Sequence, residues 1–213
     1  MVNGKDTLVG ADIELAKAIG KKLGVKVEFS VMSFDNVLAS VQSGKADIAI
    51  AGISVTDERK KVYDFSDSYY TSENVVIVKK DKVNDFTSAD SLAKQTVGTQ
   101  KGSVQETIAK KQFSKASVVS LASNGEMINE LKSGQIQAVV LEKAIAEGYI
   151  AQNDDLTLAS FNLKSDSSDA YAVAIRKGSD DLLKEINAVI KETKESGKFD
   201  QWLKEASSYK QSK

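Results

Sequence analysis

The chain has 213 residues, 41% of them hydrophobic, and a formal net charge of −1. Its length allows one or two domains with a buried core, whereas its near-neutral charge gives no electrostatic reason to expect nucleic acid or an acidic membrane surface as a partner. Because the sequence lacks histidine and cysteine, it excludes Ser-His-Asp triads, Cys-His dyads and the usual zinc sites, and no apolar run approaches the roughly 20 residues of a membrane span.

The first part of the chain alternates helical and extended patterns. Leucine or isoleucine recurs every four residues in 11–24, which predicts a helix that ends at a glycine. Strict alternation of apolar and polar residues over 25–32 predicts a half-buried strand. A short helix is expected over 36–45. The apolar run 46–52 then predicts a strand buried on both faces, as in a parallel sheet.

The same order of elements recurs in the second part of the chain. The expected elements are a strand at 96–100, a helix at 103–113, a strand at 116–122, a helix at 124–134, a strand at 138–142 and a helix at 179–196. The last helix has an apolar stripe, aspartates near its start, lysines near its end and a glycine just beyond it, as the helix dipole and C-cap preferences favour.

One internal echo bears on domain organisation. Residues 41–52 and 131–142 both show a helix end, then Ser-Gly, then an apolar strand. Such a junction is common in α/β proteins, so taken alone the echo is ambiguous. Because the surrounding order of elements is also repeated, two similar α/β lobes are the better interpretation. Alternating strands and helices imply parallel sheets with ligands at the carboxyl ends of strands.

Arg59 is one of only two arginines in a chain whose other cations are lysines. It follows a strand expected to end near Gly52, and Thr56 has the position of a helix N-cap. Helix N-termini bind anions, and a guanidinium grips a carboxylate with two hydrogen bonds. The alternative is a surface arginine paired with a neighbouring carboxylate. The candidates for this pairing are Asp57, Glu58 and Asp64.

Four further residues have both a structural and a functional interpretation. Ser103 and Glu106 have capping-box spacing, which indicates either a well-capped helix or a second set of backbone donors for an anion. Glu142 ends an apolar strand and is either a ligand contact or a solvated loop residue. Phe34 fits core packing or an aromatic face of a site. Together these residues suit a zwitterion that carries an α-carboxylate and an α-ammonium group.

Four segments occur in the order found in one family of binding proteins. They are TDERKKVYDFSDSYY (56–70), SLAKQTVGTQKGSVQE (91–106), LKSGQIQAVV (131–140) and YAVAIRKGSDDLLKEIN (171–187). On these motifs the chain resembles the polar amino-acid solute-binding proteins of ABC importers, which include lysine/arginine/ornithine-binding and glutamine-binding proteins. The resemblance covers nearly the whole chain.

The resemblance implies an α/β fold of the type II periplasmic-binding-protein kind, with two lobes joined by two hinge strands. The implied boundaries are 1–76 plus 172–213 for lobe 1 and 77–171 for lobe 2, with hinges near 74–80 and 168–175. It further implies a receptor that closes on a polar or basic L-amino acid and delivers it to an ABC permease. Such a protein is a monomer, needs no cofactor or metal and is not an enzyme.

The resemblance also assigns roles to individual residues. By this resemblance Arg59 binds the ligand carboxylate, together with the Ser54 N–H and donors around Ser103 and Val104. The remaining implied contacts are the Gly52 carbonyl, the Ser54 hydroxyl and Glu142 for the α-ammonium group, Phe34 stacked against the side chain, and Gln100 and Gln105 near the far end of the side chain.

The sequence departs from the family pattern at two places. Glu142 stands where members usually have aspartate, so the ammonium group could bind at a different depth. Members also begin with a strand and a loop ahead of the block that reads LVGADIELAKAIG (8–20) in this chain. In this chain that block stands almost at the start of the sequence, without the strand and loop ahead of it. We therefore expect an unpaired sheet edge and a missing wall of the pocket, as in a truncated or engineered variant with an incomplete site.

Two other functional classes stay open at this point. One is a dehydratase-like enzyme on the same scaffold, which would need Glu142 as a general acid. The other is the sensing domain of a larger receptor, against which the short polar tail 207–213 counts. Among ligands, arginine or lysine is expected first and glutamine next, with cystine also open. The expected location is extracytoplasmic, in the periplasm or at the cell surface on a lipid anchor, although neither signal nor anchor is visible.

Overall fold

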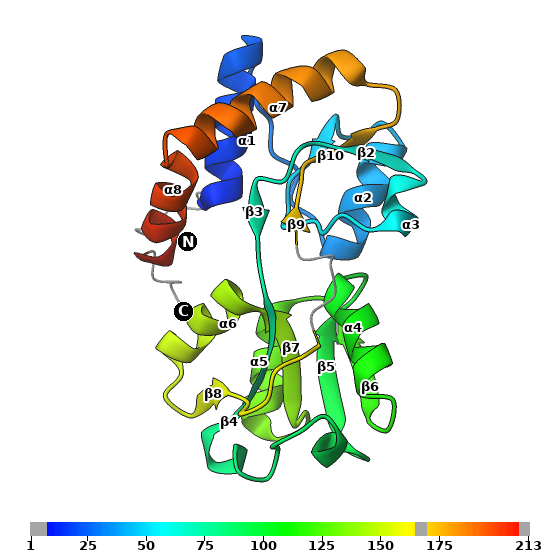
Figure 1. Ribbon diagram of the computed structural model, residues 1–213, viewed down its shortest axis with the longest axis vertical. Coiled ribbons are helices and arrows are strands. Elements are labelled where there is room, and N and C mark those ends of the chain that lie inside the picture. Colours follow the sequence, from blue (N-terminus) through cyan, green and yellow to red (C-terminus); the bar gives the residue numbers. More distant parts are fainter. Residues whose placement is uncertain (1–7, 165–169, 209–213) are drawn as a thin grey trace. The chain divides into compact units, whose positions relative to one another are not determined.

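The structure is a computed structural model that describes residues 8–164 and 170–208 (Figure 1). The chain divides into two compact units of α/β structure. The ranges of unit 1 are 1–31, 38–71 and 170–213, and those of unit 2 are 32–37 and 72–169. Over the described residues, every helix is too short or too polar to cross a membrane. The start of the hinge expected at 168–175 lies outside the described residues, as do residues 1–7 and the tail after residue 208.

Unit 1 combines helices with two small antiparallel sheets. Its elements are α1 (Ala11–Leu23), most of α2 (Phe34–Gln42), β1 (Ile48–Ala49), α3 (Asp57–Lys60), β2 (Tyr63–Phe65), β3 (Tyr70–Thr71), β9 (Ala170–Tyr171), β10 (Ala174–Arg176), α7 (Asp180–Glu195) and α8 (Lys198–Ser208). The first residues of α2, up to residue 37, are counted with unit 2. One sheet has the order β1-β10-β2, and the other pairs β3 with β9. Segments distant in the sequence therefore build one unit, because β10 inserts between two early strands.

The core of unit 1 lies between helices and the strand β10. The α7 helix buries Ile186, Val189 and Ile190, whose spacing puts them on one face. These side chains pack with residues of α1 such as Leu15 and Ile19. Figure 1 shows α7 crossing α1, with α8 beside them. This helical layer supports the strands that carry the candidate residues of unit 1.

Unit 2 is built on a five-stranded mixed sheet. Its elements are β4 (Asn74–Lys79), the short 3-10 helices η1 (Lys80–Lys82) and η2 (Asp90–Leu92), β5 (Thr96–Gln100), α4 (Val104–Gln112), β6 (Ser117–Leu121), α5 (Asn124–Ser133), β7 (Ala138–Glu142), α6 (Lys143–Gln152) and β8 (Leu156–Leu158). The strand order is β6-β5-β7-β4-β8. β5 runs parallel to β6 and β7, whereas β4 runs antiparallel to β7 and β8.

The sheet of unit 2 buries apolar side chains on both faces. β7 is buried at all five positions, because one face packs with the cluster of Val97 and Phe113 and the other with the cluster of Met127 and Leu131. The continuous apolar run of β7 is therefore a strand covered on both sides, as its sequence predicts. The carboxyl ends of β5 and β7 lead directly into the segments that carry the candidate residues.

Most predicted helices and strands are confirmed. The helices expected at 11–24, 103–113, 124–134 and 179–196 appear as α1, α4, α5 and α7, and the strand at 138–142 is β7 without change. Gly24 adopts the left-handed conformation that ends α1. The prediction of an α/β fold in two parts is also confirmed. The elements that were not predicted include α6, α8 and the short strands β2 and β3.

The strand expected over 25–32 is wrong. These residues are neither helix nor strand, and among the described residues no neighbouring strand pairs with them. Val25 and Val31 are 58% and 76% exposed, although Val27 lies against α1, where a Cβ added to Gly20 would meet its Cγ2 at 2.2 Å. The alternating pattern is that of a strand face, but a strand also needs a hydrogen-bonding partner beside it.

The strand expected over 46–52 is shorter than predicted and pairs differently. Only Ile48 and Ala49 form a ladder, with Ala174 and Ile175 of β10, and this ladder is antiparallel. In the described part of unit 1 all strand pairs are antiparallel, so the expectation of a parallel sheet holds for unit 2 alone. β1 lies at an edge of its sheet.

Candidate functional site

The candidate residues of unit 1 begin at a left-handed glycine after β1. Gly52 has φ 59°, a backbone conformation that residues with a Cβ adopt only at an energetic cost. Two residues later, Ser54 is buried and forms an antiparallel bridge with Tyr171. A Cβ at Gly52 would also lie 3.5 Å from the Tyr171 ring. The segment from Gly52 to Ser54 is thus held against β9, within unit 1.

Arg59 lies in the one-turn helix α3 that follows this segment. Thr56 caps the helix, since its hydroxyl accepts the Arg59 N–H at 3.2 Å, as predicted. The Arg59 Nη1 donates to the Ser54 carbonyl at 2.7 Å. Burial lowers the pKa of Arg59, and the nearby Tyr63 acts in the opposite direction. The guanidinium is therefore tied to the backbone of the segment that carries Ser54.

The ion pairs around α3 do not favour the alternative in which Arg59 pairs with a surface carboxylate. Each of the three neighbouring carboxylates forms an ion pair with a lysine. These pairs are Asp57 with Lys60 at 3.9 Å, Glu58 with Lys61 at 2.8 Å and Asp64 with Lys177 at 3.4 Å. A lysine-rich surface thus supplies cations for these carboxylates, and the carbonyl contact sets the position of Arg59.

Gly52 has a further contact through its backbone N–H group. Its N–H donates to the Tyr69 hydroxyl at 3.2 Å, and Tyr69 is only 4% exposed. Asp12 of α1 faces the same hydroxyl and the same N–H. Burial raises the pKa of Asp12 to about 6, although both contacts favour its charged form. Sequence reasoning missed this group, because Asp12 looks like an ordinary acidic residue in the first turn of a helix.

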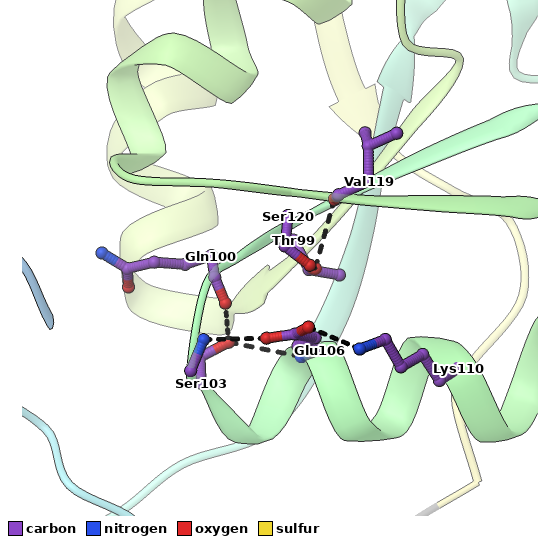
Figure 2. A network of polar contacts seen from close by, with 8 residues as sticks. Thr99, Gln100, Ser103, Glu106, Lys110, Val119 and Ser120 are labelled. Carbon is purple, nitrogen blue, oxygen red and sulfur yellow. Dashed lines mark hydrogen bonds and ion pairs between the residues drawn. The ribbon is translucent and has the colours of Figure 1, made fainter. Parts of the chain in front are cut away.

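The candidate residues of unit 2 begin at a second left-handed glycine, after β5. Gly102 has φ 76° and precedes Ser103, the predicted N-cap of α4. The Ser103 hydroxyl accepts the Glu106 N–H at 3.3 Å and donates to the Gln100 carbonyl at 2.7 Å. Figure 2 shows this turn with its polar contacts. The first N–H groups of α4, including that of Val104, point out of the helix start and suit an anion.

Glu106 completes the turn in a way that differs from a regular capping box. Its carboxylate accepts the Gly102 N–H at 2.8 Å, rather than the N–H of the cap residue Ser103, and pairs with Lys110 at 2.6 Å. Burial acts to raise the pKa of Glu106, but hydrogen bonds from Lys110, Gly102 and Ser120 outweigh it and lower the pKa. The capping spacing predicted the helix start, whereas the contact with Gly102 required the structure.

The strand before this turn is anchored by buried hydroxyl groups. Thr99 is fully buried, and its Oγ1 lies 3.3 Å from both the Val119 carbonyl and the Ser120 hydroxyl of β6 (Figure 2). The next residue, Gln100, is half-buried, and its amide donates weakly to the Ala122 carbonyl at 3.4 Å. The end of β5 is therefore fixed, while the Gln100 side chain keeps only a long contact.

Gln105 and Glu142 lie at neighbouring positions of unit 2. The Gln105 amide donates to the Asn74 side chain at 2.7 Å, and Asn74 is the register partner of Glu142 across β4 and β7. Glu142 is 5% exposed. The structure thus brings together two predicted residues that are far apart in the sequence, and it adds Asn74, which sequence reasoning did not single out.

Glu142 has a structural role that its position at a strand end did not predict. Its carboxylate caps α6 by accepting the N–H groups of Ala144 and Ile145 at 3.0 and 3.1 Å. It also accepts a hydrogen bond from the buried Ser72 hydroxyl. All three contacts tie the carboxylate to the structure of unit 2. This geometry does not favour the dehydratase alternative, in which Glu142 would have to be available to transfer a proton to a substrate.

The structure therefore groups the predicted residues into two sets. Gly52, Ser54 and Arg59 form one set in unit 1. The set in unit 2 contains Gln100, Ser103, Val104, Gln105 and Glu142. Phe34 begins α2 and is half-buried; by its contacts it is counted with unit 2. Each set joins a left-handed glycine, a buried serine and the start of a helix.

Comparison with known proteins identifies the family. The profile of the bacterial extracellular solute-binding proteins, family 3, matches residues 1–206. The chain belongs to this family. The resemblance drawn from the four sequence motifs is thereby confirmed.

Relatives of this solute-binding protein include several amino-acid-binding proteins. AbpA of Streptococcus pneumoniae, an amino acid ABC transporter substrate-binding protein solved with L-arginine, is 50% identical. The match covers 99% of this chain and 90% of AbpA, with a TM-score of 0.95. The arginine-binding extracellular protein ArtP of Bacillus subtilis is 34% identical over 93% of this chain and 78% of ArtP. The glutamine-binding protein GlnH of the same organism is 32% identical over 92% of this chain and 73% of GlnH.

Proposed function

We propose that this solute-binding protein captures an L-amino acid, with arginine as the first candidate, and delivers it to an ABC permease. The observation that carries the proposal is the position of Arg59, whose guanidinium is tied to the Ser54 carbonyl at 2.7 Å at the start of α3. A fixed guanidinium beside a helix start is suited to a carboxylate. The similarity to AbpA and ArtP supports arginine as the ligand.

The carboxylate of the amino acid would bind to donors from both sets of residues. Arg59 and the Ser54 N–H supply those of unit 1. Ser103 and the Val104 N–H, at the start of α4, supply those of unit 2. A ligand whose carboxylate binds both donor groups would favour a closed arrangement, because each group alone gives only part of the binding energy.

The α-ammonium group needs acceptors, which the proposal takes from Gly52, Ser54 and Glu142. The Glu142 carboxylate also accepts three hydrogen bonds within unit 2, which fix its position. Phe34 would stack on the side chain of the ligand. Gln100 and Gln105 would lie near its far end, where the amide oxygen of Gln100 is suited to a guanidinium.

The proposal includes the lobes inferred from the sequence. Lobe 1 would comprise 1–76 and 172–213 and lobe 2 would comprise 77–171, with hinges near 74–80 and 168–175. The protein would act as a monomer. It would work outside the cytoplasm, as the family description indicates, in the periplasm or on a lipid anchor. Closure on the ligand would present the loaded form to the permease.

The test is a thermal-shift screen against the twenty amino acids, ornithine and cystine, followed by calorimetric titration. Ligand at a hundredfold over its dissociation constant adds about 2.7 kcal/mol of stability, which raises the melting temperature visibly. A rise confined to arginine, or to basic amino acids, is expected. A folded sample that responds to none of them would contradict the proposal.

The Arg59→Ala variant tests the residue that carries the proposal. Loss of the charged partner of a buried carboxylate costs about 3–5 kcal/mol, so binding should weaken by about two to four decades. The Lys60→Ala variant is the matched control, because Lys60 lies next to Arg59 on α3 and pairs only loosely with Asp57. Micromolar binding by Arg59→Ala would overturn the assignment of the carboxylate to Arg59.

A further inference from the structure

Unit 2 contains a cavity at the end of its sheet that lies opposite the candidate residues. The cavity has a volume of about 470 Å³, a size usual for small-molecule sites. It lies where β4 ends at Lys79 and where β5 and β7 begin, and the chain between β4 and β5 forms part of its wall (Figure 1). Gln100 stands at the other end of β5, roughly 13 Å from Thr96 at the rise of a strand.

The base of the cavity is apolar and fixed by contacts within unit 2. Phe86 is 8% exposed and packs with the apolar cluster on one face of the sheet, and Ile136 is 1% exposed and packs with the cluster on the other face. The Gln137 amide oxygen accepts the Thr96 N–H at 2.9 Å, and its nitrogen donates to the Gly134 carbonyl at 2.8 Å. Because these contacts need no bound molecule, the cavity is pre-formed.

Two polar side chains of the wall keep hydrogen-bonding capacity. Lys79 and Gln95 are both half-buried. Over the described residues, no ion pair holds the Lys79 ammonium group and no hydrogen bond holds the Gln95 amide group. A hydrogen bond from Lys132, at 3.1 Å, lowers the pKa of Asp155, and the charge of Lys79 adds a smaller effect. Asp155 is therefore already paired, and Lys79 remains available to another anion.

The other charges of the wall cancel each other. Lys82 and Asp85 pair at 3.2 Å, so the excess charge of the cavity is the one ammonium group of Lys79. A single cation balances a carboxylate, whereas a phosphate monoester carries close to two negative charges. An α-amino acid is also disfavoured, because its ammonium group would find Asp85 already paired. The amide group of Gln95 adds a neutral donor beside the cation.

We propose that this cavity is a second binding site, which takes a small monocarboxylate with an apolar body. The carboxylate would lie between the Lys79 ammonium group and the Gln95 amide, and the apolar body would face Phe86 and Ile136. The inference is independent of the proposed function, since it uses none of the residues assigned to the amino acid.

Benzoate is the probe, because it joins one carboxylate to a compact apolar ring, and benzamide is a neutral comparison of nearly the same shape. Backbone amide signals of the full chain are followed by NMR while each compound is added. The signals of Gln95, Phe86 and Ile136 should move and saturate with benzoate, and should respond much less to benzamide. The absence of saturable shifts with benzoate, or equal binding of benzamide, would overturn the inference.

The Lys79→Met variant tests the residue on which the charge argument depends. It keeps an unbranched side chain but removes the ammonium group, so benzoate binding should weaken about tenfold or more. Lys80→Met is the matched control, because Lys80 is the next residue, is exposed and does not line the cavity. The same spectra show whether each variant is folded. Equal binding by Lys79→Met and the unaltered chain, or equal weakening in both variants, would overturn the assignment.

L-Arginine separates this site from the proposed amino-acid site. With saturating arginine present, benzoate should bind with an unchanged dissociation constant, because the two groups of residues lie at opposite ends of β5. Competition, together with benzoate shifts confined to Gly102 and Ser103, would place benzoate on the proposed donors for the amino-acid carboxylate and overturn the inference. If arginine does not bind but Gln95 and Ile136 respond to benzoate, the inference stands and the proposed function fails.

Discussion

The two sets of candidate residues share one backbone arrangement but differ in the electrostatics around it. In each unit a left-handed glycine precedes a buried serine and a helix start, and a carboxyl group faces the glycine N–H. In unit 2 this group is Glu106, which contacts Gly102 directly and has Lys110 at 2.6 Å. In unit 1 it is Asp12, which shares the neutral Tyr69 hydroxyl with Gly52.

The difference shows that a hydrogen bond to a carboxylate does not by itself fix the charge of that carboxylate. Burial acts to raise the pKa of Glu106, but hydrogen bonds from Lys110, Gly102 and Ser120, together with the charge of Lys110, outweigh it and lower the pKa. Burial raises the pKa of Asp12, a residue of α1, although two contacts favour the charged form of its carboxyl group. One turn is therefore held by a permanent anion at physiological pH, whereas the other is held by a group that changes charge close to neutral pH.

The largest expected effect is on the stability of the Asp12→Asn variant. The rise in the pKa of Asp12 from 3.8 to about 6 means that the folded state binds a proton more readily than the unfolded state. The stability of the unaltered chain should therefore fall as the pH rises from 4 to 6, by up to about 3 kcal/mol. The asparagine variant lacks this loss and should gain by that amount relative to the unaltered chain at pH 7.5.

Urea unfolding of both proteins at pH 4, 5, 6 and 7.5 measures this gain. Glu14→Gln is the control, because its exposed pair with Lys17 contributes little. The difference between Asp12→Asn and the unaltered chain should be small at pH 4 and grow with pH. An equal difference at pH 4 and 7.5 would show that Asp12 is not the titrating group and would remove the contrast between the two units.

The role of Asp12 also marks a boundary of sequence reasoning. Thr56 and Ser103 were predicted as caps because capping depends on residues three apart in the chain. β7 was predicted because a continuous apolar run is stable in a folded protein only when it is buried. Asp12 and Tyr69 are 57 positions apart, and the local pattern around Asp12 is that of an ordinary amphipathic helix, so a contact of this kind is set by the packing of α1.

Strand pairing has the same limit. The alternation over 25–32 identified a face but not a partner, and the described residues supply no partner strand. Glu142 shows the converse, since it was predicted as a site residue from its place at a strand end. Its role as the cap of α6 was missed because glutamate is an uncommon cap residue. The candidate site itself was assigned by resemblance, and its chemistry alone left several alternatives open.

A medium effect is expected for Glu142→Ala, the buried carboxylate of unit 2. The change removes the cap of α6 and leaves the buried Ser72 hydroxyl without this acceptor. Together these losses should lower the free energy of unfolding by about 2–3 kcal/mol. Glu147→Ala, an exposed position on α6, is the control for helix propensity.

The conservative variant Glu142→Gln separates stability from binding at this position. Its amide oxygen can still accept from Ala144 and Ser72, but its amide nitrogen then faces the Ile145 N–H and that hydrogen bond is lost. We therefore expect a smaller loss of stability in urea unfolding than for Glu142→Ala. Arginine binding measured by calorimetry should be weaker, because the charge proposed to hold the ligand ammonium group is gone. Unchanged binding in Glu142→Gln would restrict Glu142 to its capping role and would leave unit 2 with only anion-binding groups.

The smallest expected effect is that of Glu106→Gln, and its value lies in its pH dependence. The amide oxygen can still accept the Gly102 N–H, so the variant loses mainly the pair with Lys110 and the favourable charge near the start of α4. These terms should amount to about 0.5–1 kcal/mol. Because the pKa of Glu106 is lowered in the folded state, this stabilisation is present at neutral pH and is lost as the pH falls through the folded-state pKa.

Glu106→Gln should therefore be less stable than the unaltered chain at pH 7.5 and equal to it once Glu106 is protonated, which is the opposite slope to that of Asp12→Asn. Urea unfolding over the same pH series measures both slopes in one experiment. Lys110→Ala should reproduce most of the Glu106→Gln effect, because the two side chains form one pair. If Glu106→Gln instead gained stability with rising pH, burial would dominate in both turns, and the glycine contacts of the two units would be electrostatically alike.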